Sequence, residues 1–216
     1  MHSDVISHAL TIVKNEMERH FVEEYDAADA ASVVALGNIA EGFATNGGPG
    51  VPRDTLVMSI VNMREEKALK NLPQYVRNDV TLTASYQNPP LFLNFMVLLV
   101  APHQAYEGAL LMLSRALRFF QARHVFTQDD VLPASITTNA PNNALDRLAE
   151  FKLVFDLYSP SMEEVNHLWG TLGGKQYPFA MYNLRMLELK FAAVRSESGL
   201  VTEVVSSFHH RNRGGV

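Results

Sequence analysis

The sequence predicts a mixed α+β fold, with a central, mostly antiparallel or mixed sheet, two long helices packed on it and a C-terminal β-hairpin. The main observation behind this prediction is Leu91 to Val100, an almost unbroken apolar run that Pro102 closes. The run is too short to cross a bilayer as a helix and is typical of a strand buried on both faces. From His103 the apolar period becomes helical, so a long amphipathic helix follows the strand directly.

The N-terminal segment from Ser3 to Tyr25 has the pattern of a surface helix with one buried side, and Ser3 is a suitable N-cap. The predicted buried face is apolar and consists of Ile6, Ala9, Leu10, Val13, Met17 and Phe21. The charged residues lie away from that face, and we expect them in solvent: Lys14, Glu16, Glu18 and Arg19.

Three strand candidates lie between this helix and the central strand. Val33 to Ile39 is a short one, and Thr55 to Asn62 is the second, with apolar residues on both faces. Asn46 to Gly50, between them, is predicted to be a flexible loop. Arg64 to Lys67 exposes charge, and Asp79 to Tyr86 alternates weakly and is expected to pair with the Leu91 strand.

The long central helix is predicted to bury a regularly spaced set of apolar residues: Tyr106, Ala109, Leu110, Leu113, Leu117 and Phe120. The segment Val125 to Ala149 that follows contains Asp129-Asp130, Pro133 and Pro141-Asn142-Asn143. Such clusters of turn-forming residues favour an ordered connecting loop.

The C-terminal third begins with a strand at Lys152 to Tyr158. Ser161 with Glu164 three residues later forms a capping box, which starts a helix that Gly173-Gly174 ends.

A long strand from Tyr182 to Val194 follows. Ser196 to Gly199 is predicted to turn the chain back into a weaker strand, Leu200 to Phe208, which completes the C-terminal hairpin. We find no internal repeat or linker, so residues 1–208 are expected to form one domain and residues 209–216 a flexible tail.

Composition narrows the possible functions. The formal net charge of −5 argues against nucleic acid as the main partner, because phosphate binding needs a basic field. The chain has no cysteine, which excludes disulfides, cysteine-zinc sites and thiol catalysis, and fits assembly in a reducing cytoplasm. The first residues lack the pattern of a signal peptide, and we expect no insertion into a membrane.

No motif in the sequence predicts an enzyme. The eight histidines lack metal-ligand spacing, and the glycine-rich segment at Asn46 to Gly50 is not followed by Gly-Lys-Ser or Gly-Lys-Thr. There is no Gly-x-Ser-x-Gly elbow. The acidic pairs Glu65-Glu66 and Glu163-Glu164 are more typical of a solvated face than of an acid/base dyad. We therefore predict no catalytic residue, no cofactor and no metal.

Three ordered segments carry a resemblance to a known family. They are Ile60 to Asn71; Asn88 to Asn94, continuing through Tyr106, Ser114, Phe119-Phe120-Gln121 and Val125-Phe126-Thr127; and Leu153 to Tyr158, Ser161 to Lys175, Tyr177-Pro178 and Tyr182 to Met186. Together they resemble the cap, or tube-terminator, proteins of contractile injection systems, phage-tail-like particles such as the antifeeding prophage and the Photorhabdus virulence cassettes. The sequence departs from the pattern at Phe179-Ala180-Met181, where a Ser-Val-Leu-like step is expected, which changes packing only.

The resemblance implies a non-enzymatic structural protein. Six copies would form a ring that closes the distal end of the inner tube and contacts the last sheath layer. The implied partners are the chain itself, the inner tube protein and the sheath protein. The protein would be assembled in the bacterial cytoplasm, into a particle that is released or anchored to a membrane.

Two alternatives remain at this stage. One is a baseplate or tube-adaptor ring subunit of the same machinery, and the other is an unrelated small-ligand-binding or enzymatic α/β domain. The candidate interface residues are Trp169, Leu200, Val201, Val204, Val205 and Phe208. Trp169 is either an interface anchor or a plain core residue. Residues 200–208 are either an edge strand used in assembly or the closed strand of a hairpin.

Overall fold

The computed structural model describes residues 5–25, 33–44, 50–69, 75–87, 91–148, 150–189, 194–199 and Ser206. The chain divides into two compact units. The first unit comprises Met1–Leu69 and Leu91–Leu189, and the second comprises Lys70–Pro90 and Lys190–Val216. The boundary expected between residue 208 and the tail at 209–216 stays a prediction, because it lies outside the described residues.

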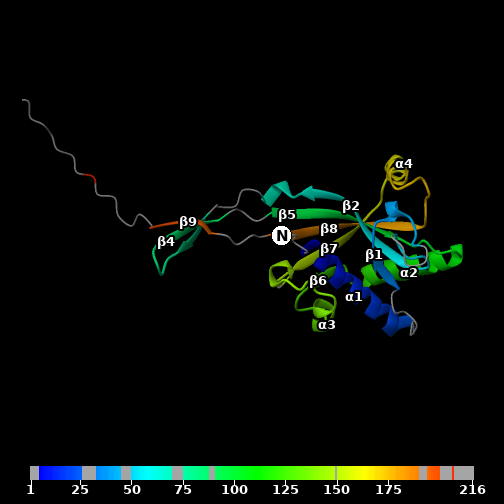
Figure 1. Cartoon of the computed structure of the whole chain (residues 1–216), viewed down its shortest axis with the longest axis horizontal. Coiled ribbons are helices and arrows are strands. Elements are labelled where there is room, and N and C mark those ends of the chain that lie inside the picture. The colour runs from blue at the N-terminus through cyan, green and yellow to red at the C-terminus, as the bar shows by residue number, and fades with distance from the viewer. Residues whose placement is uncertain are drawn as a thin grey trace, which may run out of the picture. The chain divides into compact units, whose positions relative to one another are not determined.

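The first unit is built on a six-stranded sheet with the order β1-β2-β5-β8-β7-β6 (Figure 1). Its strands are β1 (Val34–Leu36), β2 (Leu56–Glu65), β5 (Leu91–Val100), β8 (Phe179–Leu189), β7 (Lys152–Tyr158) and β6 (Val125–Thr127). Only the β1–β2 pair is parallel among these neighbours, and the other pairs are antiparallel. The predicted α+β class with a mostly antiparallel, mixed sheet is confirmed.

The apolar run Leu91 to Val100 is β5, one of the two central strands of this sheet. It pairs with β2 on one side and β8 on the other, and Val97 to Val100 have no exposed side-chain surface. A strand between two neighbours with helices on both faces must be apolar along both sides. The prediction from the run is therefore confirmed in both bounds and position.

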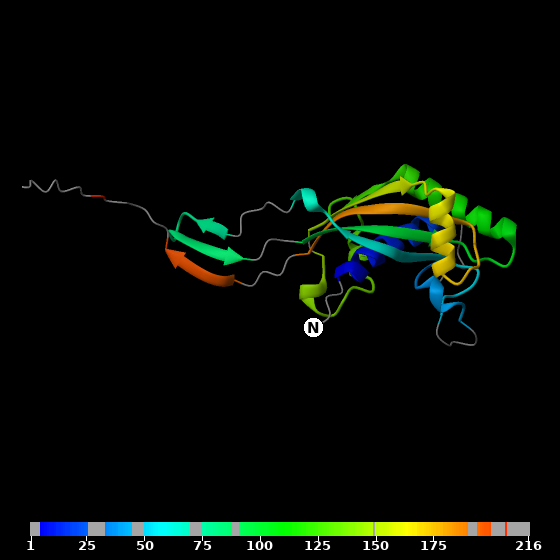
Figure 2. The same cartoon turned by 90° about the horizontal axis from the view of Figure 1, so that it is seen from above.

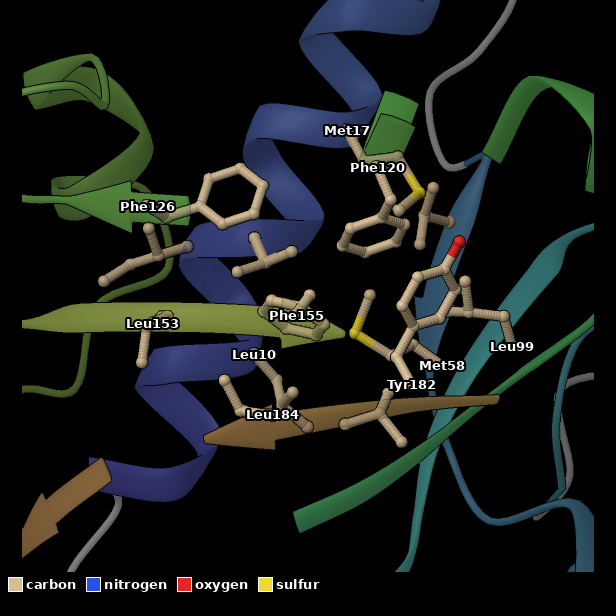
Figure 3. Close-up of a cluster of buried hydrophobic side chains, with 14 of the residues drawn as sticks. Leu10, Met17, Met58, Leu99, Phe120, Phe126, Leu153, Phe155, Tyr182 and Leu184 are labelled. Atoms are coloured by element: carbon tan, nitrogen blue, oxygen red, sulfur yellow. The ribbon is translucent and has the colours of Figure 1, made fainter. Parts of the chain in front are cut away.

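Two helices cover one face of the sheet and close the larger core. They are α1 (Val5–Tyr25) and α2 (Tyr106–Ala122). Figure 3 shows aromatic and aliphatic side chains filling the space between α1 and the strands. The ring of Phe120 lies 4.5 Å from that of Tyr182 and 4.9 Å from that of Phe155, centroid to centroid. Burial raises the pKa of Tyr182 to about 12.

The buried face of α2 differs from the predicted one. Ala109 and Phe120 are buried as expected, but Tyr106 and Leu110 are exposed. The buried positions of the helix are Ala109, Ala116, Phe119 and Phe120. Apolar residues occur around most of the circumference of this helix. The spacing of the apolar residues therefore did not determine which side of the helix faces the sheet.

The segment Val125 to Ala149 is not a plain connecting loop, as the sequence had suggested. It forms the edge strand β6, the short helix α3 (Pro133–Thr137) and the 3-10 turn η3 (Ala144–Asp146). Each piece is too short to show a period, and Pro133 stands at the start of α3, where proline is tolerated.

The other face of the sheet is covered at one end by α4 (Met162–Thr171). The predicted capping box is present, with Glu164 N–H donating to Ser161 Oγ and Ser161 N–H donating to Glu164 Oε2. Gly173 and Gly174 end the helix at φ values of 100° and 77°, which glycine adopts without strain. Under α4 and the turn η1 (Ile39–Glu41) lies a second, smaller core.

The second unit is a three-stranded antiparallel sheet with the order β3-β4-β9. Its strands are β3 (Tyr75–Asn78), β4 (Thr83–Gln87) and β9 (Val194–Gly199). Two predictions were wrong here: β4 pairs with β3 and β9 rather than with the Leu91 strand, and Ser196 to Gly199 belong to a strand rather than a turn. Polar residues such as Ser196-Glu197-Ser198 resemble a turn in sequence, and only pairing with a distant strand reveals their extended state. The predicted returning strand at residues 200–208 lies outside the described residues.

Candidate assembly surfaces

Trp169 is the one predicted interface residue that the structure describes. It lies on α4 with 4% of its surface exposed, and its ring packs against those of Phe179 and Tyr177 at 5.4 and 6.0 Å. Its Nε1 is buried and has no hydrogen-bond partner among the described residues. Trp169 therefore helps to form the smaller core, and a direct role in an interface stays a prediction. The other predicted interface residues, Leu200, Val201, Val204, Val205 and Phe208, lie outside the described residues.

The prediction for Glu16 on α1 was wrong. Glu16 was expected in solvent, but the residue is fully buried. Its Oε2 accepts hydrogen bonds from Arg19 and Arg123, each at 2.8 Å, and its Oε1 accepts from the Leu132 N–H at 3.1 Å. Desolvation raises the pKa of Glu16, but hydrogen bonds from Ser135, Arg19 and Leu132 outweigh it and leave the pKa below its ordinary value.

Two more polar residues of α1 bind the same neighbouring segment. His8 is buried, with Nε2 bonded to the Ile136 carbonyl and Nδ1 accepting from the Leu148 N–H, both at 2.9 Å. These partners assign the neutral tautomer with its proton on Nε2. Asn15 donates to the Ser135 carbonyl at 2.9 Å. Together with Glu16, these side chains anchor residues 132–148 on α1.

Beyond α4, the second face of the six-stranded sheet becomes polar. The strand registers place Asn62, Met96, Asn183 and Asp156 in one row across β2, β5, β8 and β7. All four side chains are half-buried or exposed. A sheet face of this kind suits a wet contact with another protein better than a closed core.

The next row of this face is held by ionic and polar contacts. Arg185 Nε lies 2.9 Å from Asp156 Oδ2, and Asn94 donates to Glu66 Oε2 at 2.8 Å. Hydrogen bonds from the Ala68 N–H and from Asn94 lower the pKa of Glu66. These polar groups therefore bond to one another on the surface of the sheet.

The acidic pairs have the surroundings of surface groups. Glu163 is 85% exposed at its side chain and lies 3.7 Å from the imidazole of His167, which is also exposed. Glu164 accepts a hydrogen bond from the Tyr158 hydroxyl at 2.6 Å, which lowers the pKa of the carboxyl. In the part of the chain that the structure describes, no group of three or more His, Asp or Glu side chains is placed to hold a metal ion. No helix within the same ranges is long and apolar enough to span a bilayer.

The sheet edges differ between the two units. The edge strands of the first unit, β1 and β6, are three residues each. Such short edges offer little backbone for an added strand. The edges of the second unit are longer, with four residues in β3 and six in β9. Strand addition by a partner is therefore better supported at the second unit.

Comparison with known proteins gives a family and a fold. The sequence pattern of the Pvc16 N-terminal domain matches residues 8–203. The fold is similar to the sheath/tube terminator of an extracellular contractile injection system, PVC, in its extended state, with a TM-score of 0.55 and 10% identity. It is also similar to the tube-terminating cap of the anti-feeding prophage, with a TM-score of 0.52 and 13% identity. No curated protein matches the sequence significantly.

The lengths differ between this chain and the two solved structures. The likeness covers 100% of this chain and 67% of the PVC terminator, and 91% of this chain and 60% of the anti-feeding prophage cap. At such low identity the structures show a common fold. The family match spans most of the chain and agrees with the resemblance to cap and terminator proteins that the sequence suggested. The chain belongs to the Pvc16 N-terminal domain family.

Proposed function

We propose that this chain is a structural cap subunit, which ends the inner tube of a contractile injection system and contacts the last sheath layer. The observation that carries the proposal is the family match over residues 8–203, together with a fold shared with two proteins described as tube terminators. The described surfaces support it: they include a polar sheet face with the ion pair Arg185–Asp156, and exposed apolar residues on α2.

The assembly we propose is a ring of six copies. A tube end has rotational symmetry, and a ring of identical subunits matches it by using two different surfaces of each subunit. Closing the ring buries both surfaces and avoids the open filament that the same contact would otherwise build. Light scattering of the assembled state should give a mass near six times 24.1 kDa. A stable dimer that never associates with particles would contradict the ring.

The proposed partners are the tube protein, the sheath protein and further copies of this chain. We propose no nucleic-acid partner, since the net charge is −5, and no insertion into a membrane. Assembly would take place in the bacterial cytoplasm, and the finished particle would be released or anchored to a membrane. The role we propose is mechanical, without catalysis or a cofactor.

Electron microscopy tests this function directly. Particles are purified from cells with the gene, from cells without it, and from cells in which it is restored. We expect particles without the protein to have tubes of irregular length and open distal ends, and the restored gene to return a uniform length. Gold labelling of a tagged chain should mark the end opposite the baseplate. Particles of normal length, or label at the baseplate, would contradict the proposal and favour an adaptor ring.

The segment after β9 is proposed to take part in this assembly. In residues 200–208 apolar and polar side chains come in pairs, so neither face of a strand would be fully apolar, which suits a sheet edge better than a core. The apolar members of the segment are Leu200, Val201, Val204, Val205 and Phe208. Deleting residues 200–216 should leave a folded protein, judged by circular dichroism, that no longer produces uniform tube lengths. Normal capping by the truncated protein would remove this segment from the interface.

A further inference from the structure

The side chains of Tyr75 and of residues 78–86, which the structure describes in the second unit, are mostly exposed. Among its described side chains, Ala84 is the buried one, with 5% of its surface exposed. Tyr75 and Tyr86 stand opposite each other on β3 and β4, with ring centroids 6.3 Å apart, and are 51% and 43% exposed. A small sheet becomes stable when an apolar face is covered. The second unit therefore has apolar surface to offer to a partner.

The turn between β3 and β4 is ordered and apolar at its tip. Val80 is 93% exposed, and Leu82 is 49% exposed with a φ of 51°. Asn78 Oδ1 accepts hydrogen bonds from the N–H groups of Val80 and Thr81, at 3.0 and 3.2 Å. A leucine in the left-handed region costs about 1 kcal/mol or more, and such strain is concentrated at functional sites. A turn fixed in this way presents Val80 and Leu82 outward.

The first unit has an exposed apolar surface of matching character on α2. Tyr106 is 67% exposed, Leu111 54% and Leu110 42%. These residues lie on the N-terminal half of the helix. Leu110 and Leu111 lie away from the buried Ala109, and Tyr106 lies one turn before Leu110. Apolar side chains gathered on one helix surface mark an interaction site.

The charged residues of α2 can be compared with the charge at the tip of the β3–β4 turn. Glu107 is exposed in the first turn of the helix, and Arg118 is exposed two turns after Leu111, on the same side. The tip carries Asp79 beside Val80. Opposite charges attract across an interface and like charges exclude the reversed orientation. If the tip lies on Leu110 and Leu111, these charges favour the orientation in which Asp79 is nearer to Arg118 than to Glu107.

We propose that the β3–β4 tip of one copy docks on the exposed α2 face of a second copy. This inference rests on the proposed ring and names one of its contacts. The two surfaces differ and belong to the same chain, so each copy donates a tip and receives one, which is the head-to-tail contact that closes into a ring. The contact would cover Val80 and Leu82 on one copy and Tyr106, Leu110 and Leu111 on the next.

The absence of cysteine from the chain makes this contact testable by disulfide trapping. The full-length double variant Val80→Cys/Leu111→Cys is oxidised both as purified protein and on particles. A disulfide forms only where Cα atoms come within about 7 Å. We expect most of the monomer to shift into a ladder of multiples of 24.1 kDa that reduction collapses. The matched control is Val80→Cys/Met162→Cys, because Met162 on α4 is 75% exposed, and it should leave the monomer band.

Each other outcome has a defined meaning. A single chain that loses two hydrogens without a change in size carries an internal disulfide, so its tip docks on its own α2 and the second copy is the wrong occupant. No ladder in either sample, or an equal ladder in the control, overturns the contact. If particles are capped and no ladder forms, the proposed function stands and this contact fails. If a ladder forms in solution while the chain is absent from particles, the contact stands and the proposed function fails.

The charges give a second measurement that does not rely on cysteine. Arg118→Glu should lower the ring fraction seen by light scattering, because it places a negative charge opposite Asp79. Adding Asp79→Lys to the same chain should restore the ring. An unchanged ring fraction in Arg118→Glu, or no recovery in the double variant, counts against the proposed orientation.

Discussion

The two units of the chain are stabilised by different means. The first has a sheet with a core on each face, in which side chains such as Phe155 and Leu184 are almost fully buried. The second is a three-stranded sheet whose described tyrosines are about half exposed. Burial of apolar surface is the main favourable term in folding, at about 25 cal/mol per Å². From this difference we expect the first unit to be stable by itself and the second to gain stability on assembly.

The sharpest way to break this comparison is to truncate one aromatic residue in each unit. Phe155→Ala in the first unit should lower the free energy of unfolding by about 3–5 kcal/mol, because it leaves a cavity among the surrounding rings. Tyr86→Ala in the second should cost under about 1 kcal/mol, since its ring is 43% exposed. Urea unfolding of the free protein measures both. Equal losses would show that the second unit is as well packed as the first.

A smaller effect is expected at the buried carboxylate of the first unit. Glu16→Gln should lower the free energy of unfolding at neutral pH by about 2–3 kcal/mol, because the charged acceptor of Arg19 and Arg123 is lost. Glu18→Gln is the matched control on the same helix. Its half-buried pair with Lys14 should contribute under about 1 kcal/mol.

The same carboxylate predicts a pH dependence of stability. The pKa of Glu16 is lower in the folded than in the unfolded protein, so its contribution is present above the unfolded pKa. It is lost as the pH falls through the folded pKa, and the gap between wild type and Glu16→Gln should close in acid. Urea titrations across that range measure the gap. A gap that stays constant with pH would mean that the charge of Glu16 does not stabilise the fold.

The smallest effect is expected at Trp169. Trp169→Phe leaves a small void but removes a buried N–H that has no hydrogen-bond partner among the described residues. The void lowers the free energy of unfolding by about 1 kcal/mol, and removal of the unpaired N–H raises it by about the same amount. The two effects oppose each other, so the free energy of unfolding should change by less than about 1 kcal/mol. Capping of particles by this variant then tests the predicted interface role. Normal stability with lost capping supports that role, and normal capping makes Trp169 a core residue only.

The outcome at α1 shows how far a periodic pattern can be trusted. The apolar face of the helix and its end at Tyr25 followed from the sequence, and Ala9, Val13, Met17 and Phe21 are all buried. Its predicted start at Ser3 lies outside the described residues. Glu16 could not be placed in the same way. A carboxylate is normally solvated, and its burial depends on Arg123 and Leu132, more than a hundred residues away in the chain.

The sequence by itself determined the elements whose signal is local. The apolar run of β5, the capping box at Ser161 and the glycines after α4 each act through neighbouring residues, and all were predicted where the structure has them. The family resemblance was also readable from the ordered segments. The capping box and the left-handed glycines act within a few residues, and the apolar run favours a buried strand whichever strands flank it.

Only the tertiary structure decided which strands pair and which side of a helix is buried. β4 pairs with β9, although more than a hundred residues separate the two strands in the sequence. The polar segment Ser196 to Gly199 is a strand because of that pairing. α2 is apolar around most of its circumference, and contact with the sheet selected Ala116 and Phe119 while leaving Leu110 and Leu111 exposed. Pairing and packing energies arise between distant residues, so no local pattern contains them.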